Sequence, residues 1–173
     1  MDLNWKEQNE QPDNKAEKSG FRLDQTTQRA IQDSSDPAGD HTFSDREGRE
    51  VTLRTYRSGS DRYYIRAYDN TKVQKLPETV HPGQAGYANL QIEQNEMGTR
   101  ARLQDIKTTS DYEGNGIGGE MLNQAERIAR HNGAKEIYGI APGDQQTLDW
   151  YFRRNYQIRA NNSGGTEVYK VLR

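Results

Sequence analysis

Four glycines stand close together in the stretch Tyr112-Glu113-Gly114-Asn115-Gly116-Ile117-Gly118-Gly119, directly before an apolar, periodic segment. Glycine lets the backbone turn tightly and approach a ligand without a Cβ in the way. Free N–H groups at the start of a helix, together with the helix dipole, suit a phosphate or a pyrophosphate. The stretch therefore predicts a glycine-rich turn at a helix N-terminus, and this turn is chemically suited to an anion.

Two common phosphate-binding motifs are less suitable explanations of this turn. A Walker-type loop needs Lys and then Ser or Thr after its last glycine, whereas Gly119 and Glu120 stand there. We do not favour a Rossmann fingerprint either, because the four clustered glycines do not fit it cleanly. A tight turn that binds nothing stays open as an alternative.

Apolar residues recur at helical spacing directly after the turn, which predicts a helix that ends at His131-Asn132-Gly133. These apolar residues are Ile117, Met121, Leu122, Ala125, Ile128 and Ala129. The charged residues between them are interpreted as a solvated face of the helix, and they include Glu120, Glu126, Arg127 and Arg130.

Short segments with strand-like patterns surround this helix. The segments before it predict two β-hairpins, formed by residues 51–55 with 64–68 and by residues 87–92 with 102–108. The segments after it predict a strand at 136–140, a helix at 147–154 and two strands at 156–158 and 167–172. Residues 73–80 are ambiguous, since Pro77 and Pro82 favour an exposed loop or edge.

The first 40 residues differ in composition from the rest of the chain. Residues 1–20 are dominated by polar and charged side chains, and a short helix near residues 23–32 follows, capped by Asp24. Residues 33–41 are rich in turn formers. We expect a flexible tail and linker with one weak helix over residues 1–40, and one folded domain over residues 41–173.

The overall composition excludes several classes of function. Lys plus Arg (24) nearly balance Asp plus Glu (26), so the charge gives no specific signal for a nucleic acid or an anionic membrane. The chain has no cysteine, which excludes disulfides and cysteine nucleophiles. No apolar run approaches the roughly 20 residues that span a bilayer, and no secretory signal is visible. We expect a cytoplasmic protein.

The glycine turn resembles the coenzyme A motif of the Gcn5-related N-acetyltransferase (GNAT) family. That motif consists of Gln or Arg, two residues, Gly, one residue, and Gly or Ala. Gly116 and Gly118 match its two glycine positions, whereas Glu113 departs from the first position. The preceding strand, residues 103–108, looks like the fourth strand of the family.

The resemblance continues toward the C-terminus and covers about residues 101–173. A second family signature runs from an Asn through a helix to a Tyr and ends in Gly-Phe. Asp144 stands in place of the Asn, Tyr151 in place of the Tyr, and Asn155-Tyr156 in place of Gly-Phe. Residues 1–48 have no counterpart in this comparison.

The resemblance implies an α/β (α+β) fold with a mixed, mostly antiparallel sheet flanked by helices. It implies that the sheet splays in its middle, where acetyl-coenzyme A enters between the fourth and fifth strands. Residues that the resemblance assigns to the cofactor are Ile106, Lys107, Thr108, Glu113, Gly114, Asn115, Gly116, Ile117, Gly118, Gly119 and Asp144. A backbone N–H near residues 106–108 is expected to meet the oxyanion.

By its place in the family pattern, Tyr151 is the candidate general acid toward the sulfur of coenzyme A. The alternative is a core tyrosine, since Tyr151 lies in the aromatic run Trp150-Tyr151-Phe152. Trp150 and Phe152 are interpreted as packing residues.

Asp105 is the candidate general base, because it is the best-placed carboxylate on the strand before the glycine turn. Strand alternation puts Asp105 and Ile106 on opposite faces of that strand. A solvated strand carboxylate is the alternative, with a water chain as the base. His81 and His131 are weaker candidates, and the three histidines show no metal-ligand spacing, so we expect no metal.

The resemblance thus implies direct transfer of an acetyl or related acyl group from acyl-coenzyme A to an amine, on a small molecule or a protein. Two alternatives stay open, a non-catalytic module that binds coenzyme A or a protein partner, and an α/β protein without a ligand. A homodimer and attachment to a larger protein both stay open as well.

Overall fold

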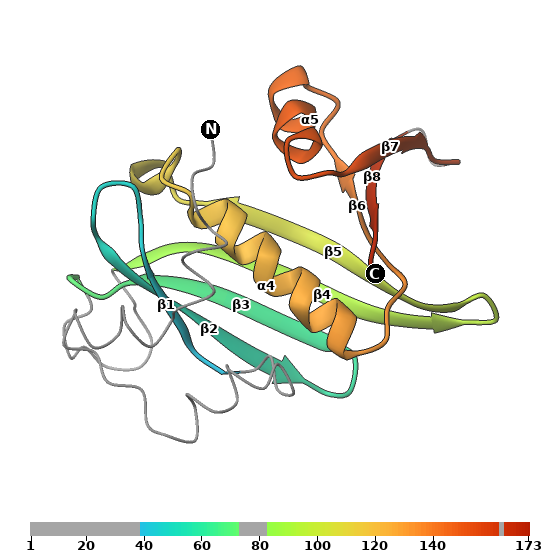
Figure 1. Ribbon diagram of the computed structural model, residues 1–173, viewed down its shortest axis with the longest axis horizontal. Helices are drawn as coiled ribbons and strands as arrows, with labels where there is room; N and C mark the ends of the chain where they lie inside the picture. The colour runs from blue at the N-terminus through green and yellow to red at the C-terminus, as the bar shows by residue number, and fades with distance from the viewer. Residues whose placement is uncertain (1–38, 73–82, 163–164) are drawn as a thin grey trace.

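The computed structural model describes residues 39–72, 83–162 and 165–173. The predictions for the N-terminal tail, its helix and residues 73–80 lie outside the described residues, and so does His81. Within these ranges, eight strands form one sheet and two α-helices pack with it (Figure 1). No α-helix in this part of the chain is long and apolar enough to cross a membrane.

From β2 onward, the order of the strands and α-helices agrees with the sequence prediction. The first strands are β1 (His41–Ser44), β2 (Glu50–Ser58), β3 (Arg62–Asp69), β4 (Gln84–Asn95) and β5 (Gly98–Thr108). A 3-10 turn, η1 (Ser110–Tyr112), precedes α4 (Ile117–His131), β6 (Glu136–Ala141), α5 (Gln145–Phe152), β7 (Gln157–Ala160) and β8 (Thr166–Val171). The strand order is β1-β2-β3-β4-β5-β6-β8-β7, and only β5 and β6 run parallel. The mixed, mostly antiparallel sheet is therefore confirmed.

Strand β1 lies where the sequence predicted the end of a linker. It pairs with β2, so that His41 lies opposite Leu53 and Phe43 lies opposite Val51. Three consecutive residues of β1 are buried, namely His41, Thr42 and Phe43. The sequence shows no strand here because the alternation of buried and exposed residues is missing. The predicted fourth strand is therefore β5.

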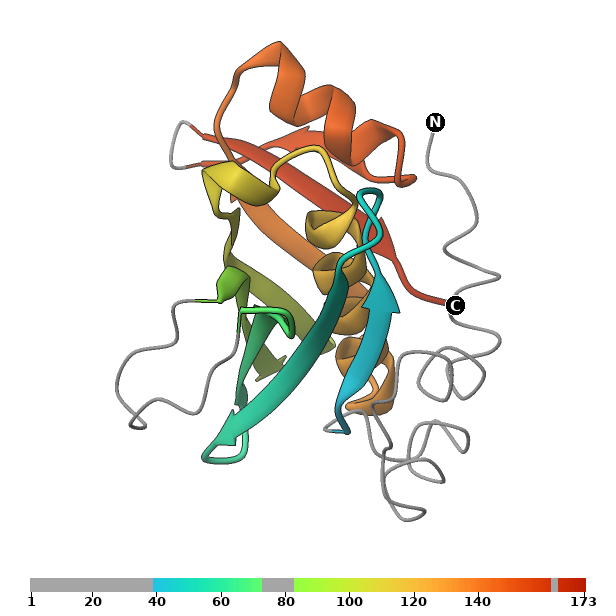
Figure 2. The same cartoon turned by 90° about the vertical axis from the view of Figure 1, so that its left-hand side faces the viewer.

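Two acidic residues of α4 are buried, which corrects the interpretation of its charged residues as a solvated face. Glu120 and Glu126 are only 5% and 4% exposed. The β1–β2 ribbon curves around the helix (Figure 2), and Glu120 lies 3.7 Å from Nε2 of His41 in β1. Glu126 accepts hydrogen bonds of 3.0 Å from Nζ of Lys170 in β8. The helix is thus covered on more than one side, and periodicity alone did not reveal this.

A β-bulge in β5 sets the direction of the side chains near the middle of the sheet. Leu103 lies opposite Leu90 of β4 but Asp105 lies opposite Asn89, so Gln104 is the extra residue. In a regular strand without the bulge, alternation would place Asp105 on the same face as the buried Leu103, two residues before it. With it, Gln104 and Asp105 are both exposed, and Ile106 turns inward.

The sheet splays directly beside this bulge. Parallel pairing between β5 and β6 is limited to Ala101 with Ile137 and Arg102 with Tyr138. Gly139 then passes so close to β5 that a Cβ on it would lie 2.9 Å from the carbonyl oxygen of Leu103. Beyond this point, β5 has no strand partner on its β6 side within the described residues. The predicted splay is therefore present.

A buried hydrogen bond attaches η1, and with it the start of the glycine turn, to the end of β3. The Tyr112 hydroxyl donates to Oδ2 of Asp69 at 2.9 Å, and the Thr71 hydroxyl donates to Oδ1 at 2.6 Å. Burial alone would raise the pKa of Asp69. The hydrogen bonds from Thr71 and Tyr112 lower it more, so it lies below the usual 3.8. The ionised carboxylate therefore stabilises the fold above that pH.

Tyr112→Phe is expected to destabilise the protein by about 1.5–3 kcal/mol at pH 7, because it removes a hydrogen bond to a buried charge. The loss should shrink as the pH falls from the usual pKa of Asp through the lowered pKa of Asp69, since the carboxylate is protonated first in the unfolded chain and then in the folded one. Urea unfolding at pH 7 and at pH 3 measures this difference. Tyr64→Phe on the opposite side of the sheet is the control, and an equal effect of both substitutions would contradict the assignment.

Candidate active site

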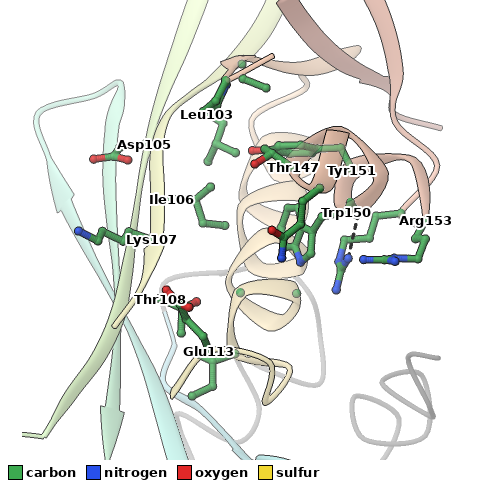
Figure 3. A pocket seen from close by; sticks show the side chains of 18 of the residues that line it. Leu103, Asp105, Ile106, Lys107, Thr108, Glu113, Thr147, Trp150, Tyr151 and Arg153 are labelled. Carbon is green, nitrogen blue, oxygen red and sulfur yellow. Dashed lines mark hydrogen bonds between the residues drawn. The ribbon is translucent and has the colours of Figure 1, made fainter. Parts of the chain in front are cut away.

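A cavity of about 750 Å³ lies where β5 and β6 separate, between the glycine turn and α5 (Figure 3). All the residues that the sequence assigned to the cofactor line it, except Asn115 and Asp144. Both catalytic candidates, Asp105 and Tyr151, also line it. His131 is not among the lining residues, since it ends α4, whereas the cavity lies at the start of that helix. The structure thus brings together residues that are separated along the sequence.

The glycine turn has the backbone shape that its sequence predicted. Gly114 and Gly116 have φ values of 75° and 88°, in the left-handed region that favours glycine. Gly116 is the N-cap of α4, so the first N–H groups of the helix have no intrahelical partner. A Cβ on Gly118 would lie 3.3 Å from Oγ1 of Thr108, and a Cβ on Gly119 would lie 3.1 Å from Nη2 of Arg154. Side chains at these two positions would crowd Thr108 and Arg154, which line the cavity.

The spacing of the glycines does not by itself exclude a Rossmann fingerprint, which corrects the interpretation made from the sequence. Gly114, Gly116 and Gly119 do have the GxGxxG spacing, and β5-α4-β6 is a parallel βαβ unit. However, β6 ends at Ala141 and not at an acidic residue, and the remaining strand pairs are antiparallel. The surrounding sheet, and not the glycine spacing, therefore separates this turn from a dinucleotide-binding one.

The turn between β1 and β2 holds the glycine turn through hydrogen bonds. The backbone N–H of Arg46 donates to the carbonyl oxygen of Asn115 at 3.2 Å, and its Nη1 donates to that of Gly114 at 3.1 Å. The Asn115 side chain donates to Glu47 at 3.2 Å, which agrees with its absence from the cavity lining. Arg46 itself lines the cavity, and sequence analysis missed it because its partners lie far away in sequence.

Asp144 acts as the N-cap of α5. Its Oδ1 accepts a hydrogen bond of 2.8 Å from the backbone N–H of Thr147, and this hydrogen bond lowers the pKa of the Asp144 carboxyl. An N-cap of this kind satisfies a donor that the helix leaves open. The observed role of Asp144 is therefore to position α5, on which Tyr151 lies.

Tyr151 extends from α5 toward β5 (Figure 3). Its side chain is 7% exposed and packs edge-on against the rings of Trp150 and Tyr156, at centroid distances of 4.8 and 5.3 Å. Burial and, to a smaller degree, the negative charge of Asp105 raise the pKa of Tyr151 to about 12. The hydroxyl is therefore protonated at neutral pH and able to donate a proton.

Asp105 lies on the other side of β5 from Tyr151 and Ile106 (Figure 3). Its Oδ2 accepts a hydrogen bond of 3.0 Å from the hydroxyl of Tyr87 in β4. Because the sheet splays beside it, Asp105 borders the cavity although its side chain lies on the exposed face. The two catalytic candidates thus approach the splay from opposite faces of the sheet.

Cationic and aromatic residues of α5 and the turn after it complete the cavity wall. Trp150 lines the cavity, and the guanidinium of Arg154 lies 4.1 Å from the centroid of its ring. Arg153 lies beside them, so two positive charges face a wall that also contains Glu113. Phe152 is 47% exposed, which corrects its interpretation as a packing residue. The sequence did not show these roles, because helical periodicity does not distinguish a cavity from a core.

Residue Asn155 explains why the second signature tolerates a departure from glycine. Its φ is 65°, and no other non-glycine residue of the described ranges has a positive φ. Asn adopts this left-handed conformation more readily than most residues, so it can replace glycine here. Tyr156 follows it and is buried, in the position where the family has Phe.

Comparisons with known proteins agree with this geometry. Residues 27–156 match the acetyltransferase (GNAT) family, whereas no curated protein matches the sequence. The chain is similar in structure to the PaiA N-acetyltransferase from Thermoplasma acidophilum in complex with coenzyme A. The identity is 17% and the TM-score 0.50, over 64% of this chain and 61% of that chain, so this chain spans less than two thirds of that protein.

Two further solved structures have a similar fold. One is a chain of the NatC complex bound to Gag peptide and CoA, with 14% identity and a TM-score of 0.52 over 64% of this chain and 71% of that chain. The other is a chain of the KacTA–DNA complex, with 13% identity and a TM-score of 0.51 over 66% and 70%. At these identities the similarity shows a shared fold.

Proposed function

We propose, from the premise that the chain belongs to the acetyltransferase (GNAT) family, that it transfers an acetyl or related acyl group from acyl-coenzyme A to an amine. The observation that carries this proposal is the open edge of β5. This edge has no strand partner beyond Arg102 on the β6 side within the described residues, and it lines a cavity that ends at the glycine turn. A backbone edge and a helix N-terminus suit an extended amide chain that ends in a pyrophosphate.

The residues present fit acyl-coenzyme A in chemistry as well as in shape. Backbone groups of 106–108 would hold the pantetheine arm, and the N–H groups of 117–119 would hold the pyrophosphate. The guanidinium groups of Arg153 and Arg154 supply positive charge at the same cavity and offset the carboxylate of Glu113. Bound acyl-coenzyme A would supply the thioester that is consumed in the reaction.

In the proposed mechanism, Asp105 and Tyr151 move protons on the two sides of the splay. Asp105 accepts a proton from the acceptor ammonium, and the free amine attacks the thioester carbonyl carbon. As the carbon–sulfur bond breaks, the Tyr151 hydroxyl donates its proton to the sulfur. The attacking nitrogen gives up its surplus proton as the amide forms, and this proton restores the hydroxyl of Tyr151. Proton transfer of this kind contributes about 10²–10⁴-fold to the rate, and the remaining acceleration comes from positioning.

A non-catalytic module that binds coenzyme A or a protein partner is the second candidate function. The observation in its favour is Glu113, which brings a negative charge into the cavity at a motif position where the family has Gln or Arg. The buried, protonated Tyr151 favours the catalytic function instead. Its hydroxyl is directed at the splay, where an enzyme uses a proton donor and a binding module does not.

The proposal includes a cytoplasmic location and an acceptor that is an amine of a small molecule or a protein. Attachment to a larger protein is part of the same proposal, supported by the NatC complex, in which a chain of similar fold is part of an assembly with a peptide. A homodimer, in which the partner is a second copy of this chain, is the other assembly that the proposal includes.

Acetyl-coenzyme A is expected to raise the thermal unfolding temperature of the protein in a saturable way. A ligand that binds only the folded state stabilises it by about 2.7 kcal/mol at a hundredfold excess over its Kd. Differential scanning fluorimetry with increasing acetyl-coenzyme A measures this effect. Coenzyme A and adenosine 3′,5′-bisphosphate are the controls, and the shift should decrease in that order as contacts are removed. No shift at millimolar ligand would refute the proposed function.

A further inference from the structure

A row of cationic residues crosses the sheet on the face opposite α4, here called the outer face. Arg54 of β2 lies directly opposite Arg66 of β3, Arg66 lies opposite Tyr87 of β4, and Tyr87 lies opposite Lys107 of β5. We call Arg54, Arg66 and Lys107 the cation row. Helix α4 packs on the inner face, and no α-helix in the described part of the chain covers the outer face (Figure 2).

The tight β2–β3 connection does not cover this face. The turn between the two strands comprises only residues 59–61, and Gly59 takes a positive φ of 67° within it. Because so short a turn leaves no room for a helix between β2 and β3, this connection adds nothing to the outer face. Tyr56 is 45% exposed, which shows how open the face is beside the cation row.

Aromatic rings hold the guanidinium groups of the cation row at the surface. The Arg66 guanidinium carbon lies 5.4 Å from the ring centroid of Tyr64 and 5.5 Å from that of Tyr87. Its Nη1 donates to backbone oxygens and to Oδ1 of Asn89 at 3.0 Å, which are uncharged acceptors. The Arg54 guanidinium carbon lies 5.9 Å from the ring centroid of Tyr68. These contacts fix the positions of the two arginines and leave their charges in place.

Positive charge in the cation row exceeds the negative charge that faces it. Arg54 has Asp40 at 3.5 Å, but no carboxylate of the described residues forms an ion pair with Arg66 or Lys107. Like charges directly opposite each other on neighbouring strands are destabilising, and Arg54 and Arg66 are such a pair. An anion bound along the row would relieve this repulsion.

The cation row leads directly to the candidate base. Lys107 and Asp105 lie on the same side of β5 (Figure 3) and are two residues apart, which corresponds to about 7 Å along a strand. Tyr87 links the cation row to Asp105, since its ring lies beside Arg66 and its hydroxyl donates to Asp105 at 3.0 Å. An amine substrate on this face therefore meets the carboxylate of Asp105, which can accept its proton. Several bonds away it meets the positive charge of the cation row.

We propose that the acceptor is a small amine that also carries an anionic group, a carboxylate or a phosphate, which binds the cation row while the amine lies at Asp105. This inference rests on the proposed acyl transfer and specifies its substrate class. The spacing of about 7 Å corresponds to an anionic group some five bonds from the amine. Arg54, Arg66 and Lys107 are then specificity-determining residues.

The test compares three amines of the same length with acetyl-coenzyme A as donor, namely 5-aminopentanoate, pentane-1,5-diamine and pentylamine. They differ only in the distal group, which is a carboxylate, an ammonium or a methyl group. We expect kcat/KM for 5-aminopentanoate to exceed that for pentylamine at least about tenfold, mostly through KM. The diamine should be the poorest of the three. 4-Aminobutylphosphonate in the same assay distinguishes phosphate from carboxylate preference.

Three variants connect the preference to the cation row. Arg66→Gln and Lys107→Gln should each lower the ratio of kcat/KM between 5-aminopentanoate and pentylamine to within about threefold. Lys135→Gln removes the same charge at an exposed position after α4, so it should keep the ratio. Arg66 also bonds to the backbone, whereas Lys107 is exposed without a side-chain partner in the described residues, so Lys107→Gln tests the row without a folding defect.

A binding measurement with glutarate gives a readout that does not need turnover. Glutarate has no amine and carries two carboxylates, both of which can bind along the cation row. Saturating coenzyme A in the calorimeter keeps it out of the cofactor cavity. Binding that Arg66→Gln weakens at least about tenfold, and that Lys135→Gln leaves unchanged, supports the inference even where none of the three amines is acetylated.

The failures of the two proposals are distinguishable. Equal kcat/KM values for the three amines would overturn the acceptor class and leave acyl transfer standing. Glutarate binding that does not respond to Arg66→Gln or Lys107→Gln would overturn it as well. Absence of coenzyme A binding in the thermal assay would overturn acyl transfer itself and, with it, the assignment of an acceptor.

Discussion

Tyr151→Phe is expected to lower kcat by about 10²-fold or more, with little change in the affinity for acetyl-coenzyme A. The substitution removes only the hydroxyl, so the ring contacts with Trp150 and Tyr156 remain. The leaving sulfur then lacks its proton donor, which acts on the transition state and not on the bound substrate. Initial rates of thiol release, together with the thermal shift, separate the two effects.

Tyr156→Phe is the matched control for this prediction. It also removes a buried tyrosine hydroxyl next to Tyr151, but that hydroxyl donates to Glu126 at 3.2 Å and does not line the cavity. We therefore expect a loss of stability with kcat unchanged. If Tyr151→Phe keeps full activity, the core-tyrosine interpretation holds, and another group protonates the sulfur.

The pH dependence gives an independent check of the same assignment. Since the pKa of Tyr151 lies at about 12, its hydroxyl is the protonated, active form throughout the range from pH 6 to 10. Deprotonation of Tyr151 would lower kcat only near pH 12. If the wild-type rate falls in the alkaline range before pH 10 is reached, a group other than Tyr151 causes the fall. The residual activity of Tyr151→Phe should then fall at the same pH.

Gly116→Asp is expected to weaken coenzyme A binding by about 10–100-fold, whereas Gly116→Asn should weaken it much less. Gly116 has a φ of 88°, and no atom lies within 4 Å of the place that a Cβ would take, so space is not the obstacle. Asn and Asp tolerate this backbone conformation similarly and have nearly the same size. Only Asp places a negative charge at the helix N-terminus, where the pyrophosphate would bind.

Calorimetric titration of both variants with coenzyme A measures this difference. Unfolding by urea accompanies it, because each substitution strains the backbone and is expected to lower stability by a similar amount. Equal binding by the Asp and Asn variants would contradict the placement of the anion at this turn. Loss of binding in both would indicate that the backbone shape, and not the charge, is what the substitutions changed.

Much of the fold was visible in the sequence because its decisive signals are local. The apolar period after Gly116 predicted α4, and Asn132-Gly133 marked its end. Alternating segments predicted the hairpins of β2–β3 and β4–β5, since each strand there has one buried and one exposed face. Missing alternation concealed β1, and the surfaces that cover Glu120 and Glu126 come from strands distant in sequence.

The candidate site was predictable to the extent that it consists of backbone. Glycines at positive φ and a helix N-terminus leave a mark in the sequence, so the turn at 114–119 was recognised directly. Arg46, Arg153 and Arg154 left no such mark, because an arginine that lines a cavity looks like one on a solvated surface. Asp144 was expected at the cofactor and is observed as a helix cap, which the same residue type serves equally well.

The sequence by itself determined the order of the elements from β2 onward and the anion-suited turn, since propensity and periodicity act over a few residues. The family was recognised from the resemblance of its motifs. Only the tertiary structure decided which side chains share a face of the sheet. The bulge at Gln104 turns Asp105 to the outer face and Ile106 toward the cavity, and the register across β2–β5 aligns the cation row. Register and bulges result from the packing of strands against each other, and no single strand encodes them.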